Sequence, residues 1–378
     1  MNRLRRYARE DIAPALAPWI VSRAIVLVAL AVARDIGEQV RVGLRAIPLR
    51  QGLFAWDAAY YRDIAQGGYD AIADAGLRFF PGLPLVARAL AWPVGGRVGP
   101  VLIVIVNLAA LAYAGALHRL VIDETADRDL ARRTIWLALL APPALCFVFG
   151  YAEAMFALLA VLVFMAARRR RWGWASAAAF AAALTRPTGV LLVAPLAIEA
   201  LAAWRATPAE RRRSTTALVP ILAVIAPAAG LLSFLGWSAA SGRGFLTPLQ
   251  IQSSSQLRGG FVAPWTALRM AGSNLGAGDR LGSGLHLVWA LVVIACVIAV
   301  ARRLPTAYWV WAALSVAVAL SAPNLDSFER YAVATFPVLI GAGVLTARPR
   351  DLYPAVLAAA GAGMFGATYL VLQARLVP

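Results

Sequence analysis

The chain has 378 residues, of which 61% are hydrophobic and only 15% are charged, and its formal net charge is +17. Because a soluble domain has about 45–50% apolar and about 25% charged residues, this composition excludes an ordinary soluble protein and predicts a polytopic membrane protein. Every basic side chain apart from histidine is arginine, and most arginines lie between apolar segments, where they contact lipid headgroups, so we expect no nucleic-acid partner.

Apolar segments in chain order predict about eleven membrane-spanning helices of ordinary length. The expected spans are residues 13–33, 98–117, 134–149, 153–167, 173–185, 188–204, 217–238, 285–301, 305–321, 331–346 and 353–373. Pro142 and Pro187 interrupt these apolar segments, and a proline can either kink or end a helix. No repeat or soluble domain is visible, so residues 1–378 are expected to form one integral-membrane domain.

Arginine clusters recur on alternate connections between these spans. They include residues 3–9, 119–133, 168–171, 205–213, 302–303 and 348–350. The positive-inside rule places these connections, and the N-terminus, on the cytoplasmic side of a cell membrane. Residues 34–97, 150–153, 238–284 and 321–330 and the turn near Arg186 are then extracytoplasmic. The last long loop, residues 238–284, is rich in Gly and Ser and is expected to be a mobile segment that closes over substrate.

The first extracytoplasmic connection contains the sequence FAWDAAYYRDIAQGGY at residues 54–69. Asp57 and Asp63 lie here among aromatic residues, which include Trp56, Tyr60 and Tyr61. Asp57 could be the N-cap of a short interfacial helix, although a cap does not explain the dense aromatic setting. Carboxylates six residues apart lie on different faces of a helix, so we expect one of them, Asp57, to work alone as a general base.

The next segment, LRFFPGLP at residues 77–84, is rigid, aromatic and basic. Arg78 is the informative residue, because a guanidinium group binds a phosphate through two hydrogen bonds. Phe80 is expected to contact the substrate that carries this phosphate. The prolines and the aromatic pair could equally form a structural re-entrant turn.

Three further charged positions open or interrupt apolar runs. Glu153 begins one, and a carboxylate at that depth is costly unless it faces a cavity or a cation. Arg186, between Thr185 and Pro187, could bind substrate or extend to the headgroups from a helix end. Glu329, Arg330 and Tyr331 open another helix, and the first two could instead pair locally and be structural.

Five segments together resemble the phosphatidylinositol-glycan mannosyltransferase V (PIG-V) family and its bacterial relatives, which are membrane glycosyltransferases of the C superfamily (GT-C). The segments are WDAAYYRDIAQGGY, RFFPGLP, PPALCFVFGYAEAMFALLA, AALTRPTGVLL and SFERYAVATFP, and they cover residues 56–337. The chain departs from the family pattern at Ala152, where the family has Ser, and it has Pro-Thr at residues 187–188, where the family often has Ser-Asn between Arg and Gly or otherwise only the pattern Arg-x-x-Gly. Heavy use of arginine and alanine is consistent with a bacterial member.

The resemblance implies an all-α, GT-C-like membrane fold with interfacial helices in an extracytoplasmic loop. It also implies an inverting hexosyltransferase that moves mannose from a polyprenyl-phosphate-mannose donor to a lipid, glycan or protein acceptor, with no required metal or cofactor. In that chemistry Asp57 is the expected catalytic base. The expected substrate-binding residues are Trp56, Tyr60, Tyr61, Asp63, Arg78, Phe80, Glu153, Arg186, Glu329, Arg330 and Tyr331.

Two other classes of protein are compatible with the composition. A transporter or flippase of lipid-linked sugars is expected to show repeat symmetry and acids near the bilayer midplane, whereas the polar residues here crowd onto one face. A non-catalytic scaffold does not need Asp, Arg and aromatic residues from four separate loops. The sequence therefore favours an enzyme and leaves its acceptor open.

Overall fold

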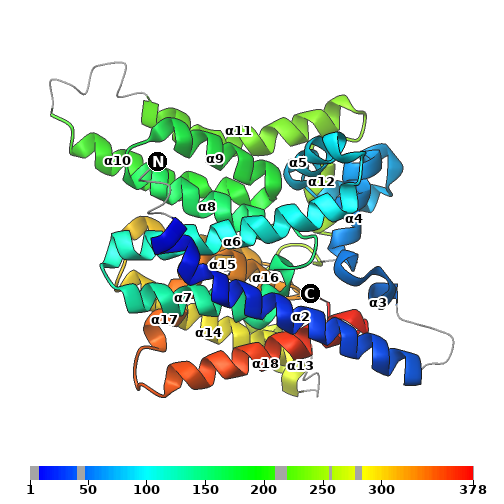
Figure 1. Cartoon of the computed structure of the whole chain (residues 1–378). Helices are drawn as coiled ribbons and strands as arrows, with labels where there is room; N and C mark the ends of the chain where they lie inside the picture. Colours follow the sequence, from blue (N-terminus) through cyan, green and yellow to red (C-terminus); the bar gives the residue numbers. More distant parts are fainter. Residues whose placement is uncertain (1–7, 41–46, 209–218, 255–257, 277–282, 378) are drawn as a thin grey trace.

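The computed structural model describes residues 8–40, 47–208, 219–254, 258–276 and 283–377, and throughout these ranges the regular structure is helical, with no strand. Most of the helices run roughly along one direction and form a bundle (Figure 1). This confirms the predicted all-α class. The predicted cytoplasmic arginines of residues 3–6 and 211–213 lie outside the described residues.

The helices are described in two groups, those that form the bundle and those in the connections between them. The helices of the bundle are α2 (Ala13–Val40), α6 (Val98–Thr125), α7 (Arg128–Leu140), α8 (Glu153–Arg168), α9 (Trp172–Thr185), α10 (Val193–Arg205), α11 (Val219–Ala240), α14 (Ser283–Ala301), α15 (Thr306–Ala319), α17 (Phe336–Leu345) and α18 (Leu352–Leu372). The remaining helices are α3 (Ile47–Gln51), α4 (Asp57–Gly67), α5 (Gly82–Ala91), α12 (Thr247–Gln252), α13 (Pro264–Gly276) and α16 (Phe328–Ala334).

Several helices are long and apolar enough to cross a membrane, as expected for a multi-pass protein. Within the described residues five meet that length and composition, and a sixth span results if α16 and α17 are taken together. The five are Glu10–Ile36, Val98–Thr125, Pro187–Arg205, Val219–Ala240 and Leu352–Leu372. The predicted total of about eleven is not confirmed, because several of the predicted spans form shorter helices.

Proline residues break two of the predicted spans. The span predicted at residues 134–149 ends as an α-helix at Leu140 and continues as a 3-10 helix, η6 (Pro142–Phe147), because proline has no N–H to donate to the preceding turn. The span predicted at residues 331–346 is bent by 87° between α16 and α17, just before Pro337. Residues 238–284, predicted as a loop, contain helices α12 and α13.

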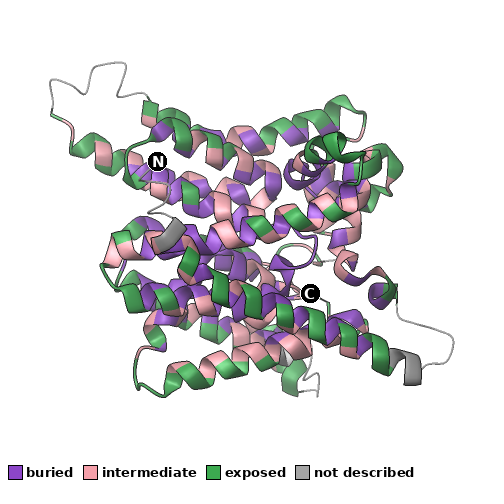
Figure 2. Cartoon of the chain, in the orientation of Figure 1, coloured by how far each residue is buried: buried purple, intermediate pink, exposed green. Residues whose placement is uncertain are grey.

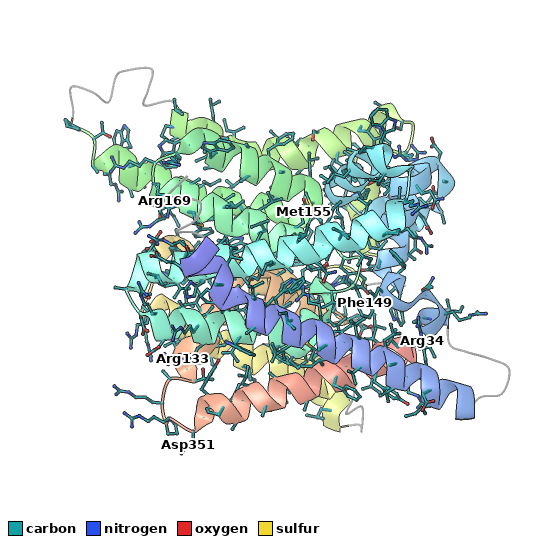
Figure 3. The ribbon with its side chains drawn as sticks, viewed as in Figure 1. Arg34, Arg133, Phe149, Met155, Arg169 and Asp351 are labelled. Atoms are coloured by element: carbon teal, nitrogen blue, oxygen red, sulfur yellow. The ribbon has the colours of Figure 1, made fainter. Side chains whose placement is uncertain are left out.

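The connections between the helices gather at two opposite ends of the molecule. Figure 3 places Arg133, Arg169 and Asp351 at one end and Arg34 at the other. The small helices α3, α4, α5 and α12 lie at the Arg34 end (Figure 1). We call this the site end, because it carries the segments whose polar residues are candidates for chemistry. The separation of the ends matches the alternation of connections that the sequence predicts.

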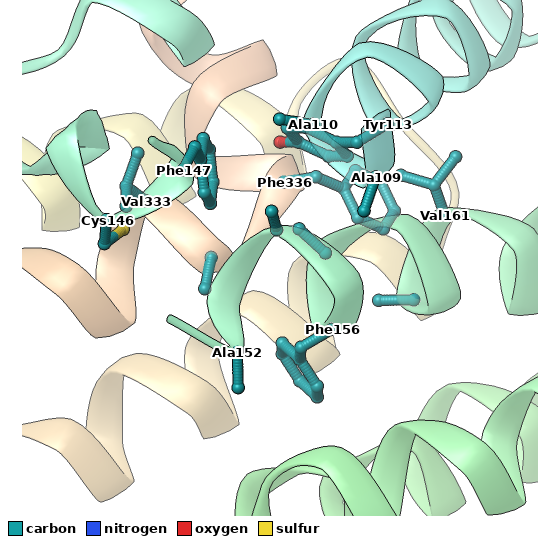
Figure 4. Packing of buried hydrophobic residues seen from close by; sticks show 14 of the residues in the cluster. Ala109, Ala110, Tyr113, Cys146, Phe147, Ala152, Phe156, Val161, Val333 and Phe336 are labelled. Carbon is teal, nitrogen blue, oxygen red and sulfur yellow. The ribbon is translucent and has the colours of Figure 1, made fainter. Parts of the chain in front are cut away.

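A core of aromatic and small residues supports the site end from inside the bundle. Figure 2 shows the burial of the central helices, and Figure 4 shows Phe147, Phe156, Phe336 and Tyr113 of α6 among the residues of this core. All four of these side chains are nearly or fully buried. Since they come from helices far apart in the sequence, they hold η6, α8 and α17 at fixed positions beneath the site.

A buried arginine compensates for the broken helix at η6. Arg23 of α2 donates from Nη2 to the backbone oxygen of Phe147 at 2.7 Å and from Nε to Oδ1 of Asn107 at 2.9 Å. Asn107 in turn donates to the backbone oxygen of Val148 at 3.2 Å. In a membrane protein, carbonyl groups that a helix break leaves without partners must find donors inside the protein. These contacts fix the segment that leads into Glu153.

Candidate active site

Asp57 is held at the start of α4 by an unusual backbone turn. Trp56 precedes it with φ 57° and ψ −126°, a conformation that a non-glycine residue rarely adopts, and its indole Nε1 donates to the backbone oxygen of Val371 at 3.0 Å. The cap position is therefore Trp56, and the interpretation of Asp57 as an N-cap is wrong. Such strain is typical of functional sites, where the surroundings impose the geometry.

Arg330 joins Asp57 to Glu153. Its Nη1 lies 2.6 Å from Oδ2 of Asp57, and its Nε lies 3.0 Å from Oε1 of Glu153. Glu153 also forms an ion pair with Arg186, and its side chain is only 2% exposed. Four charged residues from four separate segments therefore form one continuous chain, and the predicted local pair of Glu329 and Arg330 is replaced by these longer-range contacts.

Arg78 lies near the other carboxylate oxygen of Asp57. Its Nη2 lies 3.7 Å from Oδ1 of Asp57, and its guanidinium group lies 4.7 Å from the centre of the Phe79 ring. Tyr60 stacks on the same ring at 4.7 Å, and the hydroxyl of Tyr69 donates to the backbone oxygen of Phe79 at 2.6 Å. The predicted rigid segment thus orients Arg78 toward the carboxylate.

Aromatic rings separate the remaining guanidinium groups. The Tyr331 ring lies between Arg186 and Arg258, with distances of 4.8 and 4.9 Å from the guanidinium carbons to the ring centre. Arg330 lies 5.1 Å from the centre of the Tyr151 ring. Cations over aromatic faces are stabilised by the ring quadrupole. These rings therefore offset part of the repulsion between guanidinium groups that lie around one site.

These groups surround a cavity of about 330 Å³. The residues that line it are Trp56, Asp57, Tyr61, Arg78, Phe79, Phe80, Thr185, Arg186, Pro187, Gln252, Arg258, Asn324, Asp326, Ser327, Arg330, Tyr331 and Val377. Four of them are arginines and two are aspartates, so the cavity is positively charged and attracts an anion. We call it the arginine cavity.

The pKa shifts of two lining groups set their roles in the cavity. Burial raises the pKa of the Tyr61 phenol well above its usual value, so its hydroxyl remains a hydrogen-bond donor. A hydrogen bond with His286 lowers the pKa of the Asp326 carboxyl. Asp326 is therefore an anion at neutral pH and offsets part of the charge of the four arginines.

The structure brings eight of the twelve predicted site residues to the arginine cavity and separates the other four, Tyr60, Asp63, Glu153 and Glu329, from it. Asp63 pairs with Arg62 at 2.8 Å and, together with Tyr60, lines an open neighbouring cavity of about 580 Å³ that shares Asp57 and Arg78. Glu153 lies behind the cavity wall, in contact with Arg330 and Arg186.

Glu329, predicted to bind substrate, contacts His286 at 2.6 Å and does not line the arginine cavity. Its side chain instead faces two apolar cavities on the other side of α16. A helix only two turns long exposes successive residues on different faces, so the adjacent Arg330 can reach the cavity while Glu329 cannot.

Arg258 and His286 are among the contributors that were missed from the sequence. Arg258 lies in the loop predicted at residues 238–284, and its Nη2 donates to the backbone oxygen of Ala319. An arginine on the side of the membrane that the positive-inside rule disfavours is a signal that could have identified it. His286 has no comparable signal, because it lies at the start of an apolar run. Among the described residues, no cluster of His, Cys, Asp and Glu is placed to hold a metal ion.

The fold is similar to that of solved membrane enzymes. ArnT from Cupriavidus metallidurans, solved with undecaprenyl phosphate bound, aligns with a TM-score of 0.50 and 15% identity over 95% of this chain and 76% of its own. The Archaeoglobus fulgidus oligosaccharyltransferase with Zn and sulfate aligns with a TM-score of 0.44 and 14% identity over 93% of this chain and 52% of its own. AglB from the same organism, solved with an inhibitory peptide and a dolichol-phosphate, aligns with a TM-score of 0.46 and 14% identity over 96% of this chain and 55% of its own. This chain therefore spans about half the length of the archaeal enzymes.

The helical bundle and its apolar spans are those of a multi-pass membrane protein, and the likeness to ArnT shows a shared fold. A comparison with curated proteins found no match. A family model described as Mannosyltransferase (PIG-V) matches residues 42–232, which is half of the chain. The protein belongs to this mannosyltransferase family, and the resemblance seen in its sequence is confirmed.

Proposed function

We propose that the protein transfers mannose from a polyprenyl-phosphate-mannose donor to a hydroxyl group of an extracytoplasmic lipid, glycan or protein acceptor, with inversion at the anomeric carbon. The observation that carries this proposal is the position of Asp57 between Arg330 and Arg78 at the wall of a cationic cavity. A base beside several phosphate-binding groups is the arrangement that this displacement needs.

The proposed reaction is a single displacement. The acceptor oxygen forms a bond to the anomeric carbon, the bond from that carbon to the phosphate oxygen breaks, and Asp57 takes the acceptor proton. The phosphate gains one negative charge as it leaves. Arg330, Arg78 and Arg186 surround the space where that charge would develop and would stabilise it through charge-assisted hydrogen bonds.

Arg330 has two roles in this proposal. In the structure its guanidinium group pairs with Oδ2 of Asp57 at 2.6 Å and so occupies one oxygen of the carboxylate. A donor phosphate in the arginine cavity would compete for that guanidinium group and leave an Asp57 oxygen available to the acceptor hydroxyl. Asp57 would therefore be free to accept the proton of the acceptor only when the donor is bound.

An apolar cavity beside the site supports a lipid donor. It has a volume of about 390 Å³, lies between α7, α14, α17 and α18, and is lined mainly by aliphatic side chains. It shares Trp289 and Glu329 with a smaller cavity that in turn shares Arg330 and Val377 with the arginine cavity. An isoprenoid chain would fit such a path, and ArnT, which has a similar fold, was solved with undecaprenyl phosphate.

The first test is Asp57→Asn in membranes supplied with radiolabelled polyprenyl-phosphate mannose. Loss of the base is expected to lower transfer by about 10²-fold or more while the yield of folded protein stays the same. Asp74→Asn is the matched control, because Asp74 is an exposed carboxylate in the same connection and lines neither the arginine cavity nor its open neighbour. Transfer by Asp57→Asn at the wild-type rate would remove Asp57 from the mechanism.

The same labelled donor distinguishes the proposed enzyme from the alternative, a transporter or flippase of lipid-linked sugars. In sealed vesicles, wild-type protein that moves the labelled donor across the membrane and transfers no mannose would support a transporter or flippase. Transfer to any acceptor in a total membrane extract would support the enzyme and would show which extract fraction contains the acceptor.

A further inference from the structure

His286 lies between two carboxylates at the start of α14. Its Nδ1 is 2.6 Å from Oε1 of Glu329, and its Nε2 is 3.4 Å from Oδ1 of Asp326. The imidazole ring is only 5% exposed. Neither the base nor the phosphate-binding groups of the proposed reaction include it, so this cluster needs a separate explanation.

The two contacts define the charge state of the ring. An ionised carboxylate only accepts hydrogen bonds, so a ring nitrogen that faces one must carry a proton. With a carboxylate at each nitrogen, His286 satisfies both contacts only as the imidazolium cation. Glu329 is 13% exposed and faces apolar cavities, and a carboxylate in such surroundings is stable only beside a cation.

The segment that this cation holds forms one wall of the arginine cavity. Asp326, Ser327 and Arg330 all line the cavity, and α16, which begins at Phe328, packs against α14. Ser327 has φ 66°, in the left-handed region that a serine seldom adopts. Asp326 also accepts from Nδ2 of Asn324 at 3.0 Å. The tight turn therefore depends on side-chain contacts at both ends.

We propose that His286 is a positioning residue for Arg330. Its imidazolium group engages Glu329 and Asp326, so that neither carboxylate competes with Asp57, Glu153 and the donor phosphate for the guanidinium group of Arg330. The charged groups that face this cluster are Asp326, Glu329 and Arg330 around the turn and Arg258 from the segment before α13. The inference rests on the proposed function only where it assigns a lipid phosphate to Arg330.

Removal of the histidine charge gives a specific expectation. Glu329 would lose its 2.6 Å partner while still buried among apolar side chains, and the next residue in the chain is the cation Arg330. Recruitment of Arg330 by Glu329 would weaken its contacts with Asp57 and Glu153 and distort the turn at Ser327. Removal of the Glu329 charge as well would eliminate the competition and restore Arg330 to the cavity.

The test uses the purified full chain in detergent, with undecaprenyl phosphate as the probe. His286→Gln is expected to weaken its affinity by about tenfold or more, which corresponds to about 1.4 kcal/mol, and to raise hydrogen exchange in residues 320–335. His286→Gln combined with Glu329→Gln is expected to recover both quantities to near the wild-type values. His118→Gln is the matched control, because that buried histidine pairs with Asp11 and faces no residue of the cluster.

Each outcome bears on the proposal. A double variant that stays as weak and as exchanging as His286→Gln would show that the ring acts through packing alone, and the proposal would be wrong. Unchanged exchange in His286→Gln would also overturn it. If the wild type binds no undecaprenyl phosphate, the lipid-phosphate part of the proposed function fails, whereas exchange that rises in the single variant and recovers in the double variant would still support the positioning role.

Discussion

At the scale of single residues, Glu153 shows how ion pairs stabilise a buried charge at the first residue of the apolar helix α8. The carboxylate is almost completely buried, and it contacts the guanidinium groups of both Arg186 and Arg330. Burial of three charges is costly, but removal of one partner from such a group leaves uncompensated charge in a low dielectric. Glu153 therefore stabilises the arrangement of the arginines even though it does not line the cavity.

We expect Glu153→Gln to lower the free energy of unfolding by about 3 kcal/mol, because two buried guanidinium groups lose their shared counter-charge. Thermal and denaturant unfolding in detergent measure this loss. Asp123→Asn is the control, since Asp123 pairs with Arg169 at a more exposed position and is expected to cost less than about 1 kcal/mol. Equal losses in the two variants would contradict a special role for Glu153.

The lowered pKa of Asp326 gives a prediction for acid conditions. Because its folded-state pKa lies below the ordinary value of 3.8, its contribution to stability is present above that pH and is lost as the pH falls through the folded-state pKa. The difference in melting temperature between wild type and Asp326→Asn is therefore expected to be constant between about pH 5 and about pH 8, where His286 still carries its second proton, and to narrow below 3.8. A difference that widens in acid would reverse the assigned sign.

The residue scale also shows what could be predicted from the sequence. Asp57, Arg78 and Arg330 were identifiable because charged residues among aromatic or apolar neighbours are costly without a purpose. The separation of Glu329 from the arginine cavity could not be predicted, since it depends on which face of a two-turn helix meets the cavity. His286 lies 43 residues before Glu329, and no local pattern reports a contact of that range.

At the scale of helices, breaks in the bundle create the site. The sequence predicted disruptions at Pro142 and Pro187 but left open whether each would kink or end its helix. The outcome at Pro142 depends on Arg23 and Asn107, which supply donors to the carbonyls of Phe147 and Val148 from two other helices. Since those donors come from distant positions, the local sequence alone could not decide it.

Close approach of the helices gives a prediction at the same scale. Gly230 of α11 lies against α9, where an added Cβ would overlap the backbone oxygen of Phe180 and approach Cβ of Ala183 at 3.0 Å. Gly230→Ala is therefore expected to lower the melting temperature by several degrees, because backbone atoms cannot move aside as a flexible side chain can.

Gly236→Ala is the matched control on the same helix. A Cβ at Gly236 would meet no atom within 4 Å, so this variant is expected to be neutral or slightly stabilising through its higher helix propensity. If both variants unfold at the same temperature as the wild type, the contact between α9 and α11 is looser than the structure indicates. Thermal unfolding of the two proteins in one detergent provides the comparison.

At the scale of the whole molecule, two long connections meet at the site end. Asp70 in the first connection forms an ion pair with Arg243, which follows α11, and α12 packs against the segment that ends in Arg78. The opposite end carries the arginine clusters around Arg133 and Arg169 (Figure 3). The two ends of the molecule therefore differ: one carries the arginine cavity and the other carries the arginine clusters of the short connections.

This asymmetry predicts that the site end faces the extracytoplasmic side of the membrane. Ser241 is exposed beside the Arg243 ion pair, and Asp129 is exposed at the start of α7, on the arginine-rich end. The two native cysteines are buried, so single cysteines introduced at these positions can be labelled selectively. In intact cells a membrane-impermeant maleimide is expected to label Ser241→Cys and to label Asp129→Cys only after permeabilisation. The reverse pattern would place the arginine cavity on the cytoplasmic face, where an extracytoplasmic acceptor could not reach Asp57.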